Sequence, residues 1–140
     1  MEPPVRYMMP DLDPSGHFSS IGKNHADAIE QAGFKYVVNL SSWGAHRDKG
    51  TGGIVGTHYY EQVMNGLPSN VSITHIRPVS LYYNLLSFMP AIKYTGRIAA
   101  AYGGENRSLL VAPEDIAIAI AEELEDTADS RNIRYVPATN

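Results

Sequence analysis

The stretch that first suggests chemistry is a glycine-rich run at residues 50–56, Gly-Thr-Gly-Gly-Ile-Val-Gly. Glycine-rich loops that follow a strand and open a helix can wrap the phosphates of a nucleotide. A dinucleotide fingerprint places its first glycine directly after the strand and has the spacing G-x-G-x-x-G. Here the preceding apolar run ends near Leu40, and Gly50, Gly52 and Gly56 are spaced G-x-G-x-x-x-G. We therefore expect a connecting loop rather than a phosphate cradle.

Histidines are the next candidates, because their unperturbed pKa lies nearest neutrality. The chain has 5 of them, with no i, i+4 pair and no His-Glu-x-x-His sequence. That spacing does not predict a metal centre. His58 is the best candidate for a proton donor. The alternative is a structural role, in which His58, Tyr59, Tyr60 and Glu61 are distributed around the sides of a partly buried helix.

Alternating strand and helix patterns must position these groups. Apolar residues recur at helical spacing from Phe18 to Ala32, and Gly33 follows at the usual place for a left-handed C-cap. Residues 35–42 form a β-rich run that predicts a buried strand ending near Leu40. Further extended segments are predicted at residues 5–9, 70–79, 96–102, 107–112 and 133–138.

Three more helices and a turn complete the pattern. The turn-forming residues of 10–16 predict a turn, 57–67 has helical composition, and 81–89 predicts a short buried helix. Pro113 opens a helix at its first turn. The buried stripe predicted for that helix is Ile116, Ile120 and Leu124. Because strands alternate with helices, the sequence predicts an α/β protein with a largely parallel sheet.

Length and composition restrict the class further. A chain of 140 residues is about one domain, and its net charge of −4 with 11 scattered basic residues lacks the electrostatic footprint of a nucleic-acid binder. No apolar run approaches the ~18 residues that span a bilayer. The absence of cysteine and of a signal-peptide pattern makes a cytoplasmic protein our expectation.

Several stretches together carry a family resemblance. The stretches, in chain order, are KYVVNLSSWGAH, GTHYYEQVM, SITHIRPVSLYYNLL and LLVAPEDIAIAIAEEL. In that order and spacing they resemble the NmrA-like branch of the atypical short-chain dehydrogenase/reductases. Residues 7–38 are similar to that family's fourth strand and the helix after it. The resemblance implies a Rossmann-type sheet that binds NAD(P).

The resemblance also implies that the N-terminal half of the family fold is not represented in this sequence. The sequence corresponds to the C-terminal half of the family fold, as a single partial NAD(P)-binding domain over residues 1–140. The implied fold is a partial Rossmann-type α/β fold, with a mostly parallel sheet and flanking helices but no N-terminal βαβ fingerprint unit. NAD(P)H binding would then be weakened, and the edge of the strand at Val5–Met9 would be covered by a second copy or by another partner.

By the same resemblance, the cofactor lies beside two strand ends. Ser41 and Ser42 follow the predicted strand, and a hydroxyl there can donate to a carbonyl oxygen of substrate; a capping or turn role is the alternative. The resemblance implies cofactor contacts from Leu40, Ser41, Pro78, Val79 and Ser80. It implies a substrate pocket bordered by Trp43, Tyr82, Tyr83 and Asn84, although the tyrosines equally fit a core position.

The superfamily's usual catalytic pair, Tyr-x-x-x-Lys, is absent. Tyr59 and Tyr60 stand in the corresponding region, but their i+4 partners are Val63 and Met64. A lysine at that spacing would lower the pKa of the tyrosine so that it could pass a proton. Without the lysine, classical carbonyl reduction is in doubt.

Three interpretations of function follow. The first is a protein related to NAD(P)H-dependent oxidoreductases, weak or inactive alone, in which Ser41 or Ser42 polarises the acceptor and His58 or Tyr59 shuttles a proton. The second is a non-catalytic nucleotide-sensing or regulatory interaction module. The third is a gene fragment without independent function.

Overall fold

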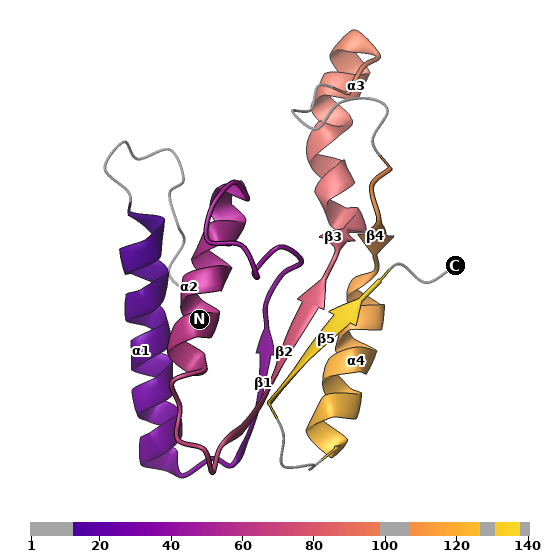
Figure 1. Ribbon diagram of the computed structural model, residues 1–140. Coiled ribbons are helices and arrows are strands. Elements are labelled where there is room, and N and C mark those ends of the chain that lie inside the picture. Colours follow the sequence, from indigo (N-terminus) through magenta and orange to yellow (C-terminus); the bar gives the residue numbers. More distant parts are fainter. Residues whose placement is uncertain (1–12, 99–106, 127–130, 138–140) are drawn as a thin grey trace.

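The computed structural model describes residues 13–98, 107–126 and 131–137 (Figure 1). The predicted strand at Val5–Met9 lies outside these residues. Helices are α1 (Pro14–Ala32), α2 (Val55–Met64), α3 (Met89–Thr95) and α4 (Pro113–Glu125), with 3-10 helices at Gly52–Ile54 and Tyr82–Phe88. Strands are β1 (Tyr36–Leu40), β2 (Ser72–Pro78), β3 (Ser80–Leu81), β4 (Leu110–Val111) and β5 (Arg131–Val136).

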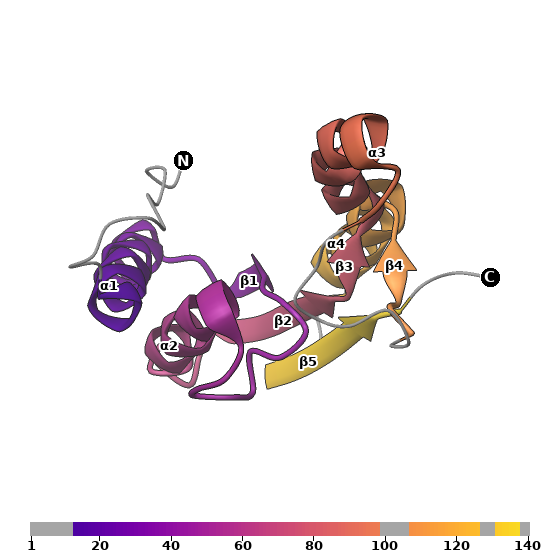
Figure 2. The ribbon, with the colours of Figure 1, turned by 90° about the horizontal axis from the view of Figure 1, so that it is seen from above.

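The main sheet has three strands in the order β1-β2-β5, and both neighbouring pairs are parallel. Strand β2 is central, with Leu40 opposite Ile76 on one side and Tyr135 opposite Arg77 on the other. Helices α1 and α2 lie toward one face and α4 toward the other (Figure 2). A second, two-stranded parallel sheet, β3 with β4, continues beyond β2. The described chain is therefore α/β, with parallel strands in open sheets and flanking helices, as expected.

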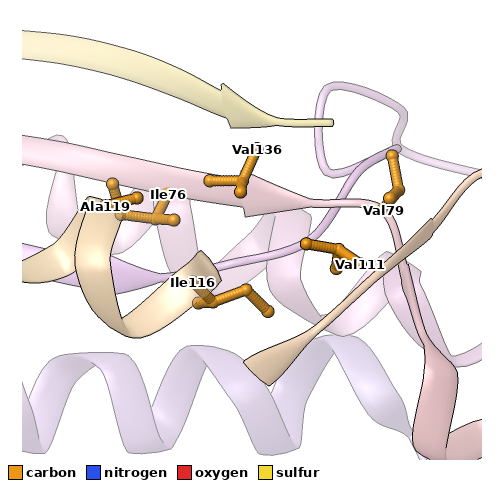
Figure 3. Packing of buried hydrophobic residues seen from close by; sticks show 6 residues of the cluster. All are labelled: Ile76, Val79, Val111, Ile116, Ala119 and Val136. Atoms are coloured by element: carbon orange, nitrogen blue, oxygen red, sulfur yellow. The ribbon is translucent and has the colours of Figure 1, made fainter. Parts of the chain in front are cut away.

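Two apolar clusters fill the space between the sheet and the helices. Side chains alternate between the faces of a strand, so Ile73 joins the α1–α2 cluster while Ile76 joins the α4 cluster. The α4 cluster consists of Ile76, Val79, Val111, Ile116, Ala119 and Val136 (Figure 3). The α1–α2 cluster consists of Ala26, Met64, Leu67, Val71 and Ile73. Both clusters bury side chains of the central strand, which fixes its position between the two helical layers.

Helix α1 is present as predicted but begins before Phe18, and its buried face runs through Phe18 and Ala26 and leaves Ala32 exposed. Asp13 caps its N-terminus by accepting a hydrogen bond from the Ser15 backbone N–H at 3.0 Å, and Gly33 ends it with a φ of 71°. The prediction of a turn over residues 10–16 is therefore wrong from position 14 onward. Aspartate and proline favour turns, but they equally favour the N-cap and first turn of a helix.

The buried stripe of α4 differs from the predicted one. Ile116 and Ala119 are buried and Ile120 is half-buried, whereas Leu124 is 56% exposed. The contact of α4 with the sheet therefore runs through positions 116, 119 and 120, and the last turn of the helix lies beyond it.

The segment from Tyr82 to Ile98 is the largest departure from expectation. It forms a 3-10 helix followed by α3 and projects away from the main sheet (Figure 1). The prediction of a buried helix at 81–89 is wrong, because no other described element covers this segment. Its exposed large apolar side chains are Tyr82, Tyr83, Leu85, Leu86, Met89, Ile92, Tyr94 and Ile98.

Two predicted strands are shorter than expected or only partly described. Of residues 96–102, Gly96 ends α3 with a φ of 67°, positions 97 and 98 are not strand, and the rest lie outside the described residues. Of residues 107–112, Leu110–Val111 alone form a strand. None of the described helices combines the length and apolar character that crossing a membrane would need.

Candidate functional site

A cavity of about 570 Å³ opens where β1 and β2 end. Ligand sites of open parallel sheets lie outside the carboxyl ends of the strands, and the volume is within the range of small-molecule pockets. The lining residues are Leu40, Ser41, Ser42, Trp43, Ile54, Pro78, Val79, Ser80, Leu81, Asn84, Arg107, Ser108, Leu109 and Ile116.

The residues that follow β1 and the residues at the end of β2 form two walls of this cavity, and backbone hydrogen bonds hold these walls together. The Ser41 N–H donates to the Ile76 carbonyl at 2.7 Å, and the Trp43 N–H donates to the Pro78 carbonyl at 2.9 Å. These bonds continue the pairing of β1 with β2 past the last residue of β1. The Val79 N–H is also engaged, since it donates to the Val136 carbonyl at 3.3 Å. The walls are therefore extensions of the sheet rather than free loops.

Most of the residues expected at the site come together in this cavity. The expected residues that line it are Leu40, Ser41, Ser42, Trp43, Pro78, Val79, Ser80 and Asn84. The expected residues that do not line it are His58, Tyr59, Tyr82 and Tyr83. The second group lies on α2 and on the projecting segment.

Ser41 lies between the cavity and a buried ion pair. Its hydroxyl donates to Glu61 Oε1, and the Arg77 guanidinium holds the same carboxylate through Nε at 3.0 Å and Nη2 at 2.5 Å. Arg77 also donates through Nη1 to the Tyr135 hydroxyl at 3.0 Å. Glu61 and Arg77 are 3% and 5% exposed. The Ser41 hydrogen is thus committed to Glu61 and is not directed to a ligand.

Hydrogen bonding sets the charge states in this network. Burial alone would raise the pKa of Glu61, but the hydrogen bonds from Arg77 and Ser41 outweigh it and lower that pKa below its ordinary value. The hydrogen bonds to Glu61 likewise raise the pKa of Arg77. Both groups are therefore ionised at neutral pH, and each neutralises the other inside the protein.

Sequence reasoning missed this ion pair. Arg77 belongs to a strand in which every residue from Ile73 to Pro78 is buried. A charged residue within a strand rich in β-branched residues must find a partner if that strand is buried, and that signal was available. Its partner, Glu61, is 16 positions away on α2, which spacing alone does not identify.

A second set of polar contacts centres on His75, a buried residue of the same strand. His75 Nδ1 accepts a hydrogen bond from Asn39 Nδ2 at 2.9 Å, and His75 Nε2 donates to Asn65 Oδ1 at 3.1 Å. Burial lowers the pKa of His75 below its usual value, although the charge of Glu61 acts in the opposite direction. His75 is therefore neutral at neutral pH and serves to join β1, β2 and the end of α2.

Ser42 is the better placed of the two serines for contact with a ligand. It is half-buried, and its hydroxyl makes a single long hydrogen bond of 3.3 Å to the Trp43 carbonyl. Exchanging so long a bond for one to a ligand oxygen costs little. Of the two predicted acceptor-polarising hydroxyls, Ser42 fits that role and Ser41 does not.

His58 is occupied by the loop before α2. Its Nδ1 donates to the Ala45 carbonyl at 2.8 Å, and its ring lies edge-on against Tyr59, with centroids 5.3 Å apart. The Ala45 side chain is buried. These contacts fit the structural alternative, in which His58 anchors the turn after β1 to α2.

The glycine-rich run divides into an open loop and a helix start. Gly50 and Gly52 have φ values of 77° and 58°, and Gly52–Ile54 forms a 3-10 turn. Helix α2 follows at Val55, slightly before the predicted start. Gly56 is buried against α1, where an added Cβ would overlap the Phe18 ring. The loop expectation holds for the first part, whereas Gly56 is required for helix packing.

No group of three or more His, Cys, Asp or Glu side chains in the described ranges is arranged to hold a metal ion. Neither the scan against protein-family models nor the search of curated proteins gives a match for this chain.

Proposed function

We propose that this chain is a nicotinamide-nucleotide-binding module of the NmrA-like type, with a partial Rossmann-type fold. The cavity at the ends of β1 and β2 would receive the nicotinamide end of NAD(P)H. One observation carries the proposal: all the residues for which the resemblance implies cofactor contacts line this one cavity. They are Leu40, Ser41, Pro78, Val79 and Ser80.

The topology supports the same proposal. Three neighbouring parallel strands with helices toward both faces are typical of one half of a doubly wound sheet. The glycine fingerprint that would hold the pyrophosphate is not in the sequence. Binding would therefore depend on the nicotinamide end and would be weaker than in a complete Rossmann domain.

In a reductase of this type, hydride passes from the reduced nicotinamide ring to the carbon of an acceptor carbonyl, and a proton must reach its oxygen. Ser42 can donate a hydrogen bond to that oxygen and polarise the bond. The described lining residues offer no group that titrates near neutrality, and His58 lies outside the cavity. The proton would then come from solvent.

The hydrogen bonds of two expected catalytic residues favour a second candidate function, nucleotide sensing without turnover. The Ser41 hydroxyl is held by Glu61, and His58 is held by Ala45, so two of the expected catalytic groups have structural partners. Binding of NAD(P)H is common to both candidates, and only turnover separates them.

Titration with NADPH and NADH, followed by calorimetry, tests the shared claim. Ser80 is exposed on the cavity wall, so Ser80→Tyr should fill part of the cavity and weaken binding at least tenfold. Ser20→Tyr, at an exposed position of α1, is the matched control and should bind as wild type. Absence of binding, or equal binding by both variants, would overturn the proposal. The absorbance of the reduced nicotinamide is then followed after carbonyl compounds are added. A decrease indicates a reductase, and a constant absorbance indicates a sensor.

A further inference from the structure

The charge of the cavity lining comes from a single side chain. Among the described residues that line the cavity, Arg107 is the one that carries a charge. No carboxylate within the described ranges lies at ion-pair distance from its guanidinium. The other described lining residues are neutral, so within the described part of the chain the charge of the cavity is positive.

The neutral lining is mainly apolar. Its apolar members are Leu40, Trp43, Ile54, Pro78, Val79, Leu81, Leu109 and Ile116. The remaining neutral groups are serine hydroxyls and the Asn84 amide. Such a surface binds an apolar body and fixes its orientation through a few polar contacts. Trp43, which is 46% exposed, offers a flat face to a ring.

Desolvation decides what else the ligand must carry. Arg107 is exposed while the cavity is open, and a ligand that fills the cavity takes water away from its guanidinium. A neutral ligand would displace part of that water without replacing its interaction with the charge, which disfavours binding. An anionic ligand replaces the lost water with a charge-assisted hydrogen bond.

We infer that the cavity selects an organic anion, with an apolar ring-sized body against Trp43 and an anionic group at Arg107. This inference concerns the ligand of the site under Proposed function and rests on that site being a binding cavity. The anionic group is a carboxylate of the substrate or a phosphate of the nucleotide; the two share the same chemistry toward a guanidinium.

Calorimetric titration with 2-naphthoate and its neutral analogue 2-naphthamide tests the inference, because the two differ mainly in charge. Wild-type protein should bind the naphthoate about fivefold or more tightly, the size expected for one partly exposed charge pair. Arg107→Gln should remove the preference, and Arg107→Lys should keep most of it. Arg97→Gln, an exposed arginine outside the cavity, is the matched control and should behave as wild type.

A parallel NADPH titration of Arg107→Gln identifies the source of the anion. Loss of the naphthoate preference with unchanged NADPH binding supports a substrate carboxylate. Loss of the preference together with weakened NADPH binding supports a nucleotide phosphate. If the preference survives in Arg107→Gln, or if wild type binds the two naphthalenes equally, the inference is wrong. If the naphthoate preference holds but NADPH does not bind, the proposed function fails and this inference stands.

Discussion

The Ser41 hydroxyl donates its hydrogen to the Glu61 carboxylate, so a residue of the cavity wall is bonded directly to a buried charge. Glu61 in turn is held by two hydrogen bonds from Arg77. The wall of the cavity is therefore fixed from behind by an ion pair between α2 and β2. This arrangement engages the Ser41 hydroxyl in a structural hydrogen bond and leaves Ser42 with the weaker bond of the two serines.

Two ion pairs of equal length should differ greatly in their effect on stability. Arg77–Glu61 and Arg134–Glu122 both have an N–O distance of 2.5 Å, but the first pair is buried and the second is largely exposed. Glu61→Gln would leave the Arg77 charge buried without a partner and should lower the free energy of unfolding by about 3–5 kcal/mol. Glu122→Gln, the matched surface control, should lower it by less than ~1 kcal/mol.

Urea unfolding followed by circular dichroism measures both variants. A double replacement, Glu61→Leu with Arg77→Met, should recover much of the stability lost by Glu61→Gln, because no charge stays buried. Equal costs for Glu61→Gln and Glu122→Gln would contradict the account of the buried network.

Gly56→Ala should destabilise the protein although alanine favours helix. Replacing glycine in a helix gains up to about 1 kcal/mol, but the added Cβ would overlap the Phe18 ring, and overpacking costs about 1–3 kcal/mol. The net effect should therefore be a loss of stability. In a Phe18→Ala background the clash disappears, and the same substitution should become neutral or stabilising. A double-mutant cycle by thermal unfolding checks this; additivity of the two substitutions would mean that the helices do not meet at this point.

Acidification should destabilise the fold in two steps, and His75 controls the first. Burial lowers the pKa of His75 in the folded protein, so the unfolded chain binds the proton more readily. Its contribution is present above about pH 6.5, the ordinary histidine value, and is lost as the pH falls below it. The Glu61 contribution, also from a lowered pKa, is lost only below about pH 4.3.

The measurement is the free energy of unfolding of wild type and His75→Gln between pH 7.5 and 5. The variant should be less stable at pH 7.5 but should lose less stability on acidification, because it lacks the group that takes up the proton. Parallel pH dependences for the two proteins would show that protonation of His75 does not cause the loss of stability in this pH range.

Trp43 should report nucleotide binding directly. It is the one tryptophan of the sequence, lines the cavity and lies edge-on to Tyr135 with ring centroids 5.8 Å apart. The reduced nicotinamide ring absorbs in the range of tryptophan emission, so bound NADPH should quench Trp43 fluorescence saturably. Oxidised NADP⁺ lacks that absorption band and should quench less. Equal quenching of the protein and of free N-acetyltryptophanamide would indicate optical filtering instead of binding.

Local patterns in the sequence predicted the scaffold. The helix that ends at Gly33, the strand ending at Leu40 and the helix opened by Pro113 are all present, because each depends on residues that are neighbours in the chain. The prediction that this strand is buried is wrong, since β1 is an edge strand of the described sheet and none of its residues is buried. The exposure of Leu124 and of the projecting segment at Tyr82–Phe88 was likewise not predictable from local patterns. Whether these residues are buried depends on whether another element packs against them, and hydrophobic periodicity carries no information about such partners.

The candidate site was predicted only in part, because some of its features depend on neighbouring residues and others on partners distant in the chain. Ser42 follows the end of a predicted strand, Val79 was expected there from the family resemblance, and the topology of parallel strands brings the two together. The partners that decide chemical roles are distant in sequence. Neither the bond from Ser41 to Glu61 nor that from His58 to Ala45 can be read from residue types. These bonds changed the roles expected for Ser41 and His58.

The most direct test separates the two halves of the cofactor. Reduced nicotinamide mononucleotide and adenosine monophosphate should be titrated separately, with chemical shifts of the Trp43 indole and of the Ser42 and Val79 region as the readout. The account predicts saturable binding of the nicotinamide mononucleotide, with shifts confined to the cavity lining, and no comparable response to adenosine monophosphate. Binding of adenosine monophosphate alone, or of neither nucleotide, would contradict the claim that this cavity receives the nicotinamide.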